Sequence, residues 1–74
     1  MLQAYRVVKA FSAKQLEREP LHLERFRIGE LVFALRSEDG YTVFCRLSEV
    51  PTLDGRPSFM ISDEDFADLL APIA

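Results

Sequence analysis

Four arginines and one phenylalanine are the residues whose types and spacing best suit a binding function. They are Arg25, Arg27, Arg36, Phe44 and Arg46. If Phe26 points into the protein, Arg25 and Arg27 point outward, because successive side chains of a strand alternate between its two faces. By the same rule Phe44 and Arg46 share one face of a later strand. Arginines around an exposed aromatic ring could stack a nucleotide base or hold an acidic peptide.

The alternative interpretation of this group is structural. Phe44 would be covered by a C-terminal helix, and the arginines would pair with acidic residues that are close in the sequence. Such acids are available at Glu24, Glu30 and Glu49. The sequence leaves both interpretations open.

Catalytic and metal-binding signatures are weak. His22 could act as a base, but the sequence places no Ser or Cys nucleophile beside it, and Cys45 fits a buried thiol. The acids Asp63, Glu64, Asp65 and Asp68 are dense, yet acids at the start of a helix are common for electrostatic reasons, and the calcium-loop pattern is missing. We therefore expect no enzyme activity, no metal and no cofactor.

Composition narrows the class of protein. The 74 residues fit one small domain, 1–74, and 49% of them are apolar, enough for a core without disulfides or metal. Residues 1–36 carry seven Lys or Arg against four acids, whereas residues 37–74 carry two against eight. The acidic second half disfavours nucleic-acid binding by that half. With one Cys and no apolar run of signal or membrane-span length, we expect a cytoplasmic protein with no membrane partner.

The elements that must position these residues are organised around a hairpin over residues 26–47. Two runs rich in Val, Leu, Phe and Tyr flank Ser37-Glu38-Asp39-Gly40, which predicts a turn closed by Gly40 in the left-handed conformation of a type I turn plus bulge. In the second run the alternation puts Tyr41, Val43 and Cys45 on the expected inward face. Gly29-Glu30 predicts a bend before the first arm.

The N-terminal third predicts one strand, over residues 4–11. Ser12 and Gln15 have the spacing of a capping box, so residues 13–18 form either a helical turn ended by Pro20 or a charged loop. Leu21 and Leu23 have the opposite parity to Phe26 and Ile28, which are expected to point inward. This difference predicts a bulge or a bend near Glu24 or Arg25.

The C-terminal third predicts a turn, a strand and a helix. Asp54-Gly55 indicates a second hairpin turn, and residues 59–61 make a short strand. Ser62 is a predicted N-cap. Phe66, Leu69, Leu70 and Ile73 fall on one helical face, and Pro72 limits the helix to about two turns.

This order of elements resembles an SH3-like barrel. The matching pieces are a first strand over 4–11, a charged loop over 12–24, the Phe26-Arg27-Ile28-Gly29-Glu30 step, the acidic-Gly hairpin and the strand over 59–61. The resemblance implies a mainly β fold, a barrel of about five strands with one short C-terminal helix. An α+β sheet with a packed helix is the alternative.

The peptide-binding residues of eukaryotic SH3 domains do not carry over. That surface uses a Trp after the acidic-Gly turn, where this chain has Tyr41, and a Pro and a Tyr near the C-terminal helical turn, where residues 62–66 have neither. The expected function is therefore a small non-enzymatic protein-interaction module that docks a protein partner or copies of itself. Nucleic-acid binding through the arginine-rich face is the alternative.

Overall fold

The chain folds into a curled antiparallel sheet with one short helix. The computed structural model describes residues 3–47 and 57–73, so the predicted Asp54-Gly55 turn lies outside the described residues. The elements are β1 (Gln3–Val7), β2 (Phe11–Gln15), β3 (Leu23–Phe26), β4 (Leu31–Glu38), β5 (Tyr41–Arg46), β6 (Phe59–Ser62), α1 (Asp63–Leu69) and β7 (Leu70–Pro72). The mainly β prediction is confirmed, with seven strands in the described residues rather than about five.

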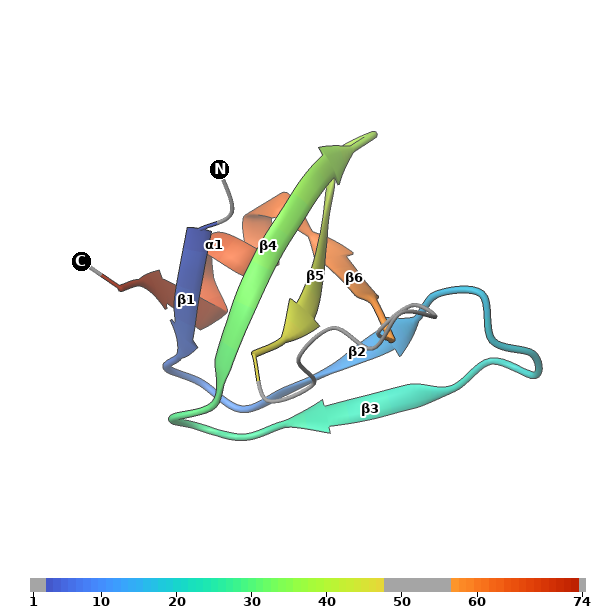
Figure 1. The fold of residues 1–74 in the computed structure, drawn as a ribbon, viewed down its shortest axis with the longest axis horizontal. Coiled ribbons are helices and arrows are strands. Elements are labelled where there is room, and N and C mark those ends of the chain that lie inside the picture. Colours follow the sequence, from blue (N-terminus) through green and yellow to red (C-terminus); the bar gives the residue numbers. More distant parts are fainter. Residues whose placement is uncertain (1–2, 48–56, 74) are drawn as a thin grey trace.

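The strands form one sheet in the order β3-β2-β6-β5-β4-β1-β7. Every neighbouring pair is antiparallel. Figure 1 shows how the sheet curls: β1, β4 and β5 lie roughly upright in this view, and β2 and β3 lie across the lower part of the molecule. The result is a half-barrel whose two edge strands are β3 and β7.

The central hairpin is confirmed, but its turn is shorter than predicted. Glu38 pairs with Tyr41, so only Asp39 and Gly40 lie between β4 and β5. Both have positive φ, 49° and 82°, as in the mirror-image turns that match the twist of two-residue hairpins. The extra residue of the hairpin is instead Leu35, where the β4–β5 register shifts between Ala34 and Arg36.

The region after the first strand differs most from the prediction. The first strand ends at Val7, and residues 11–15 form β2, neither a helical turn nor a loop. Phe11 and Ala13 are buried while Ser12 and Lys14 are exposed, which is the period-two pattern of a strand. Burying Phe11 against Phe26 outweighs the local capping signal at Ser12.

The strand that follows is also more regular than predicted. β3 pairs with β2 without interruption from Leu23 to Phe26, so there is no bulge at Glu24 or Arg25. The parity conflict is resolved differently: Phe26 is buried, whereas Ile28 lies in the turn before β4 and is 70% exposed. The prediction that Ile28 points inward is therefore wrong. The predicted bend at Gly29 is confirmed by its φ of 94°.

The core is built from aromatic rings that the curl brings together. Five of the six phenylalanines are buried: Phe11, Phe26, Phe44, Phe59 and Phe66. The ring centres of Phe26 lie 5.0 Å from Phe11, 5.0 Å from Phe59 and 5.2 Å from Phe44. Phe44 therefore marks the enclosed face of β5, and the predicted assignment of the Cys45 face as the inward one is wrong. Cys45 is nevertheless buried, on the opposite face.

The helix closes one end of the half-barrel (Figure 1). Ser62 is its N-cap, as predicted, and its hydroxyl accepts from the Asp65 N–H at 3.1 Å. Phe66 points into the core, where its ring packs edge-on against Tyr5 at 4.8 Å. The helix ends at Leu69, and Leu70 begins β7 beside β1, so the predicted helical face stops short of Ile73.

Candidate functional site

Arg46, the last residue of β5, lies inside the curl of the sheet rather than on the outer surface. Its Nε donates to Glu30 Oε1 at 3.0 Å, and its Nη1 lies 3.4 Å from Glu24 Oε1. Nη2 donates to the backbone carbonyl of Arg25 at 2.6 Å. The guanidinium also lies over the ring of Phe26, and its side chain is only 14% exposed. Arg46 therefore joins the end of β5 to the edge strand β3.

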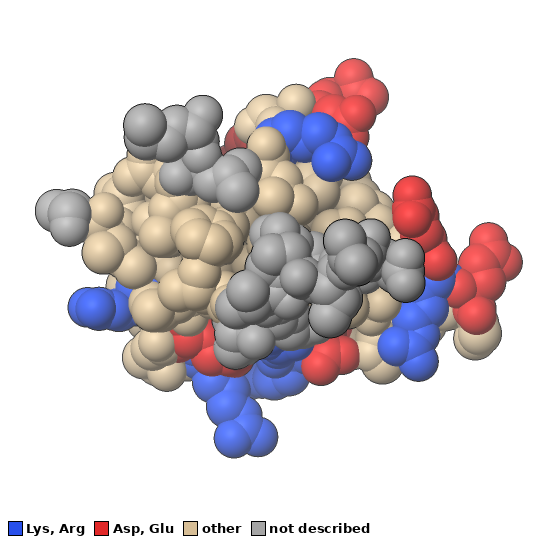
Figure 2. Space-filling view, in the orientation of Figure 1, with Lys and Arg blue, Asp and Glu red and all other residues tan. Residues whose placement is uncertain are grey.

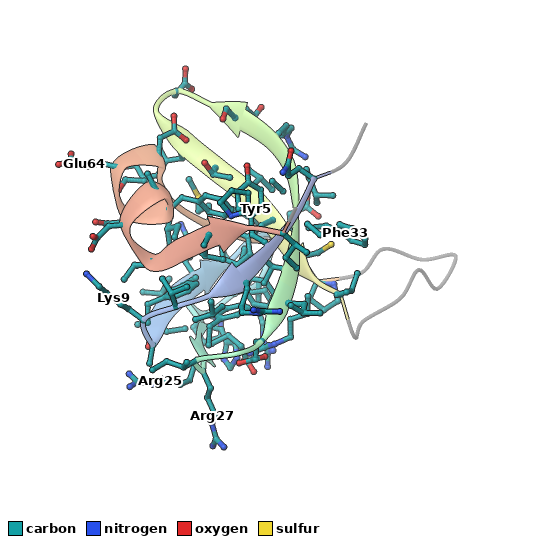
Figure 3. All side chains as sticks on the ribbon, turned by 90° about the vertical axis from the view of Figure 1, so that its left-hand side faces the viewer. Tyr5, Lys9, Arg25, Arg27, Phe33 and Glu64 are labelled. Carbon is teal, nitrogen blue, oxygen red and sulfur yellow. The ribbon has the colours of Figure 1, made fainter. Side chains whose placement is uncertain are left out.

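The predicted arginine group is divided by the fold. Phe44 is fully buried among the core rings, so no surface aromatic is available at that position for stacking. Arg36 pairs with Glu38 at 3.1 Å beside the tip of the β4–β5 hairpin. That tip is at the opposite end of the molecule from β3 (Figure 1). Only Arg25 and Arg27 remain exposed near each other, and both point out from the body of the molecule in Figure 3.

Two carboxylates around Arg46 are held in their charged form. A hydrogen bond from His22, at 2.7 Å, and the charge of Arg46 hold the pKa of Glu24 below its ordinary value. Burial opposes ionisation of Glu30. The Arg27 N–H, which donates to Glu30 Oε2 at 2.6 Å, and the Arg46 guanidinium outweigh it and lower the pKa of Glu30. The acids near Arg46 are therefore engaged in holding the fold together.

His22 lies beside the carboxylate of Glu24, a contact that the sequence did not identify. The imidazole of His22 is half-buried. Cys45 is buried on the face of the sheet that points away from the aromatic core.

A pocket of about 210 Å³ opens beside Arg46 and Glu24; its other lining residues are Gln15, Arg18, Pro57 and Phe59. This volume is below the roughly 300 Å³ at which small-molecule sites begin.

Three acidic residues of α1, Asp63, Glu64 and Asp65, lie in its first turn, and Asp68 lies near its end. Asp63 accepts a hydrogen bond from the Thr42 hydroxyl at 2.6 Å, and Asp68 pairs with Lys9 at 3.2 Å. Across residues 3–47 and 57–73 there is no group of three His, Cys, Asp or Glu arranged to hold a metal ion.

The largest exposed apolar side chains gather on and around β3. Leu21 is 65% exposed, Leu23 59% and Ile28 70%. Leu21 and Leu23 have the same strand parity as the exposed Arg25 and Arg27. We call Leu21, Leu23, Arg25, Arg27 and Ile28 the β3 strip. Figure 2 shows Lys and Arg side chains protruding along the lower side of that view, where β3 lies in Figure 1.

Sequence reasoning identified Arg25 and Arg27 but missed the apolar part of the β3 strip. A leucine is normally assigned to the core, and the predicted irregularity near Glu24 or Arg25 would reconcile the parity of Leu21 and Leu23 with that of Phe26. The available signal was their parity, which is opposite to that of the buried Phe26. Surface leucines are ordinary when scattered singly, but a set on one edge strand is a candidate contact surface.

Comparisons with known proteins identified no relative of this chain. A scan against models of protein families, a search of curated proteins and a search of solved structures each found no match to this chain. Within the described ranges, no helix is long and apolar enough to cross a membrane.

Proposed function

We propose that this chain is a small, non-enzymatic protein-interaction module with an SH3-like barrel, and that its docking surface is the β3 strip. The observation that carries this proposal is the exposure of Leu21, Leu23 and Ile28 near Arg25 and Arg27, on and directly beside the edge strand β3. A partner that covers these residues removes apolar surface from water. The two arginines favour a partner with acidic groups opposite them.

The SH3-like assignment is supported by the connections between strands. β4, β5 and β6 form a consecutive antiparallel meander, and α1 follows β6 directly. The chain then returns as β7 beside β1, which also pairs with β4. The β2–β3 hairpin occupies the place of the long charged loop in the SH3 order of elements. This arrangement supports the fold resemblance without supplying the aromatic shelf of eukaryotic SH3 domains.

Nucleic-acid binding is the weaker candidate. It needs a face on which arginines surround an aromatic ring, and the ring predicted for that role, Phe44, belongs to the core. Arg46 is held by Glu24 and Glu30 rather than offered to a phosphate. Arg25 and Arg27 alone offer two charges, few for a backbone-binding surface.

The test is retention of host proteins on the immobilised chain, with and without nuclease treatment. Wild type is compared with Leu21→Ser/Leu23→Ser and with Arg25→Glu/Arg27→Glu. Arg6→Glu/Arg36→Glu is the matched control, since it reverses two exposed arginines outside the β3 strip. We expect the wild-type chain to retain a host protein even after nuclease treatment. Both β3 strip variants should fail to retain that protein, and the control variant should still retain it.

Two outcomes would contradict the proposal. A retained protein that ignores both strip variants would place docking elsewhere on the molecule. Retained nucleic acid that disappears in Arg25→Glu/Arg27→Glu, with no protein retained after nuclease, would favour the nucleic-acid candidate. All variants should first be shown to give the wild-type circular dichroism spectrum.

A further inference from the structure

The backbone of β3 has one side free for a further strand. Gln15 N–H donates to the carbonyl of His22 at 2.9 Å, and the β2–β3 register continues from this pair to Ala13 and Glu24. In an antiparallel pair, the residues between such bonded pairs turn their N–H and C=O groups away from the partner strand. The backbone groups of Leu23 and Arg25 therefore face the open edge of the sheet.

Side chains occupy one half of this edge. The Arg25 carbonyl accepts from Arg46 Nη2, and the Arg27 N–H donates to Glu30 Oε2. Arg46 and Glu30 are themselves paired at 3.0 Å, so together they cover the edge on either side of Phe26. In the described part of the chain, the outward N–H and C=O of Leu23 have no such cover. The open half of the edge is thus centred on Leu23.

The other edge of the sheet is blocked. In β7, Ala71 is opposite Arg6, and Ile73 N–H donates to the Ala4 carbonyl at 3.0 Å, so the outward-facing positions are Leu70 and Pro72. Proline has no N–H, and the Leu70 N–H caps the helix by donating to the Phe66 carbonyl. β7 therefore lacks the donors that strand addition requires, and β3 is the edge that can accept one.

The sequence of β3 is complementary to itself when two copies run antiparallel about Leu23. A two-fold axis at Leu23 places Leu23 opposite Leu23 of the second copy, in the bonded geometry that its outward N–H and C=O need. It places His22 opposite Glu24 of the second copy, a pairing of imidazole with carboxylate. It also lays Leu21 along the aliphatic stem of Arg25 of the second copy, whose carbonyl keeps its hydrogen bond from Arg46, so the backbone pairing is centred on the two Leu23 residues.

We propose that the partner at the β3 strip is a second copy of this chain, joined by antiparallel pairing of the two β3 strands about Leu23. This inference rests on the proposed function, because it names the occupant of the same surface. The pairing closes the only edge that each copy offers in the described residues, so it gives a dimer and no longer assembly. The contact is small, which places it among weak interfaces.

The test is sedimentation equilibrium of the full chain between about 10 μM and about 1 mM, the range expected for a weak interface. Wild type should be a dimer at the upper end of this range. Leu23→Lys and Leu23→Glu should each be monomeric there, because each puts like charges opposite one another at the axis. Mixing the two variants should restore the dimer, since Lys then faces Glu.

The matched control is Val8→Lys and Val8→Glu, at an exposed apolar position outside the β3 strip. These variants should dimerise like wild type, and mixing them should change nothing. A wild type that stays monomeric up to about 1 mM, or a dimer that survives Leu23→Lys, would overturn the inference. If wild type stays monomeric while the β3 strip still retains a host protein, the docking function stands with a different partner. If neither dimer nor retention is observed, both proposals fail.

Discussion

The guanidinium of Arg46 lies over the ring of Phe26, 4.1 Å from its centre. The same guanidinium reaches two carboxylates and a backbone carbonyl, so its charge is shared between the aromatic core and the edge of β3. A cation held in this way joins strands that are not neighbours in the sheet, since β2 and β6 lie between β3 and β5 in the strand order.

Replacing Arg46 should therefore destabilise the fold. Arg46→Met keeps much of the side-chain bulk but leaves Glu24 and Glu30 without their cation, and we expect the free energy of unfolding to fall by about 2 kcal/mol. Urea denaturation at pH 7 measures this change. Arg36→Met is the control, because the Arg36–Glu38 pair is exposed and should contribute less than about 0.5 kcal/mol. Equal losses in the two variants would contradict the role assigned to Arg46.

Lowering the pH should destabilise the fold, because it protonates Glu24 and Glu30, the two carboxylates that contact Arg46. The pKa values of Glu24 and Glu30 are lower in the folded chain than the ordinary value of 4.5. Lowered pKa values mean that the unfolded chain takes up protons first, so their contribution is full above about pH 5 and is lost as the pH falls through the folded-state pKa values. Urea denaturation at several pH values between 7 and 3 measures this.

The matched variant for the acid dependence is Glu30→Gln, which cannot ionise. It should be less stable than wild type at pH 7 and should lose less stability than wild type between pH 5 and pH 3. The double variant Glu24→Gln/Glu30→Gln should show a still smaller loss. If the free energy of unfolding falls with pH as steeply in both variants as in wild type, other carboxylates cause the acid dependence.

The two-residue turn gives a third prediction. Gly40 has a φ of 82° and open space where a Cβ would lie, so Gly40→Ala meets only the backbone penalty of the left-handed region. We expect a loss of about 1 kcal/mol, measured by urea denaturation. Asp39→Asn should be nearly neutral, because Asn also tolerates the positive φ of 49° found at Asp39. An equal loss in both variants would argue against the two-residue turn.

The parts of the fold that the sequence predicted are those whose signals are local. The central hairpin combines alternation with a turn glycine, and the helix start combines Ser62 with three acids, so each can be identified within about ten residues. β2 was missed because its stability depends on residues far along the chain: Phe11 pairs with Phe26, and Gln15 with Phe59. A local pattern at Ser12 cannot reveal those partners, and it predicts either a helical turn or a charged loop instead.

The candidate site was only partly predictable for a related reason. Both faces of β5 are apolar and both are buried, with Val43 and Cys45 on one face and Phe44 on the other. The sequence of such a strand does not indicate which of its faces the curled sheet encloses. Because Arg46 is on the same face as Phe44, its direction, inward or outward, depends on which face is enclosed. Arg25 and Arg27 could be placed correctly because β3 has a single buried face, marked by Phe26.

Phe66 provides the most direct test of how the helix is docked. Its side chain is 6% exposed, and its ring contacts Tyr5 of β1 and Phe44 of β5, 5.8 Å between centres for the second pair. Phe66→Ala should leave a cavity between the helix and both strands and lower the free energy of unfolding by about 3 kcal/mol, a large share for so small a domain. Urea denaturation measures the loss, and Glu64→Ala, on the exposed side of the helix, is the control. A loss below about 1 kcal/mol would mean that the helix contributes little to closing this end of the half-barrel.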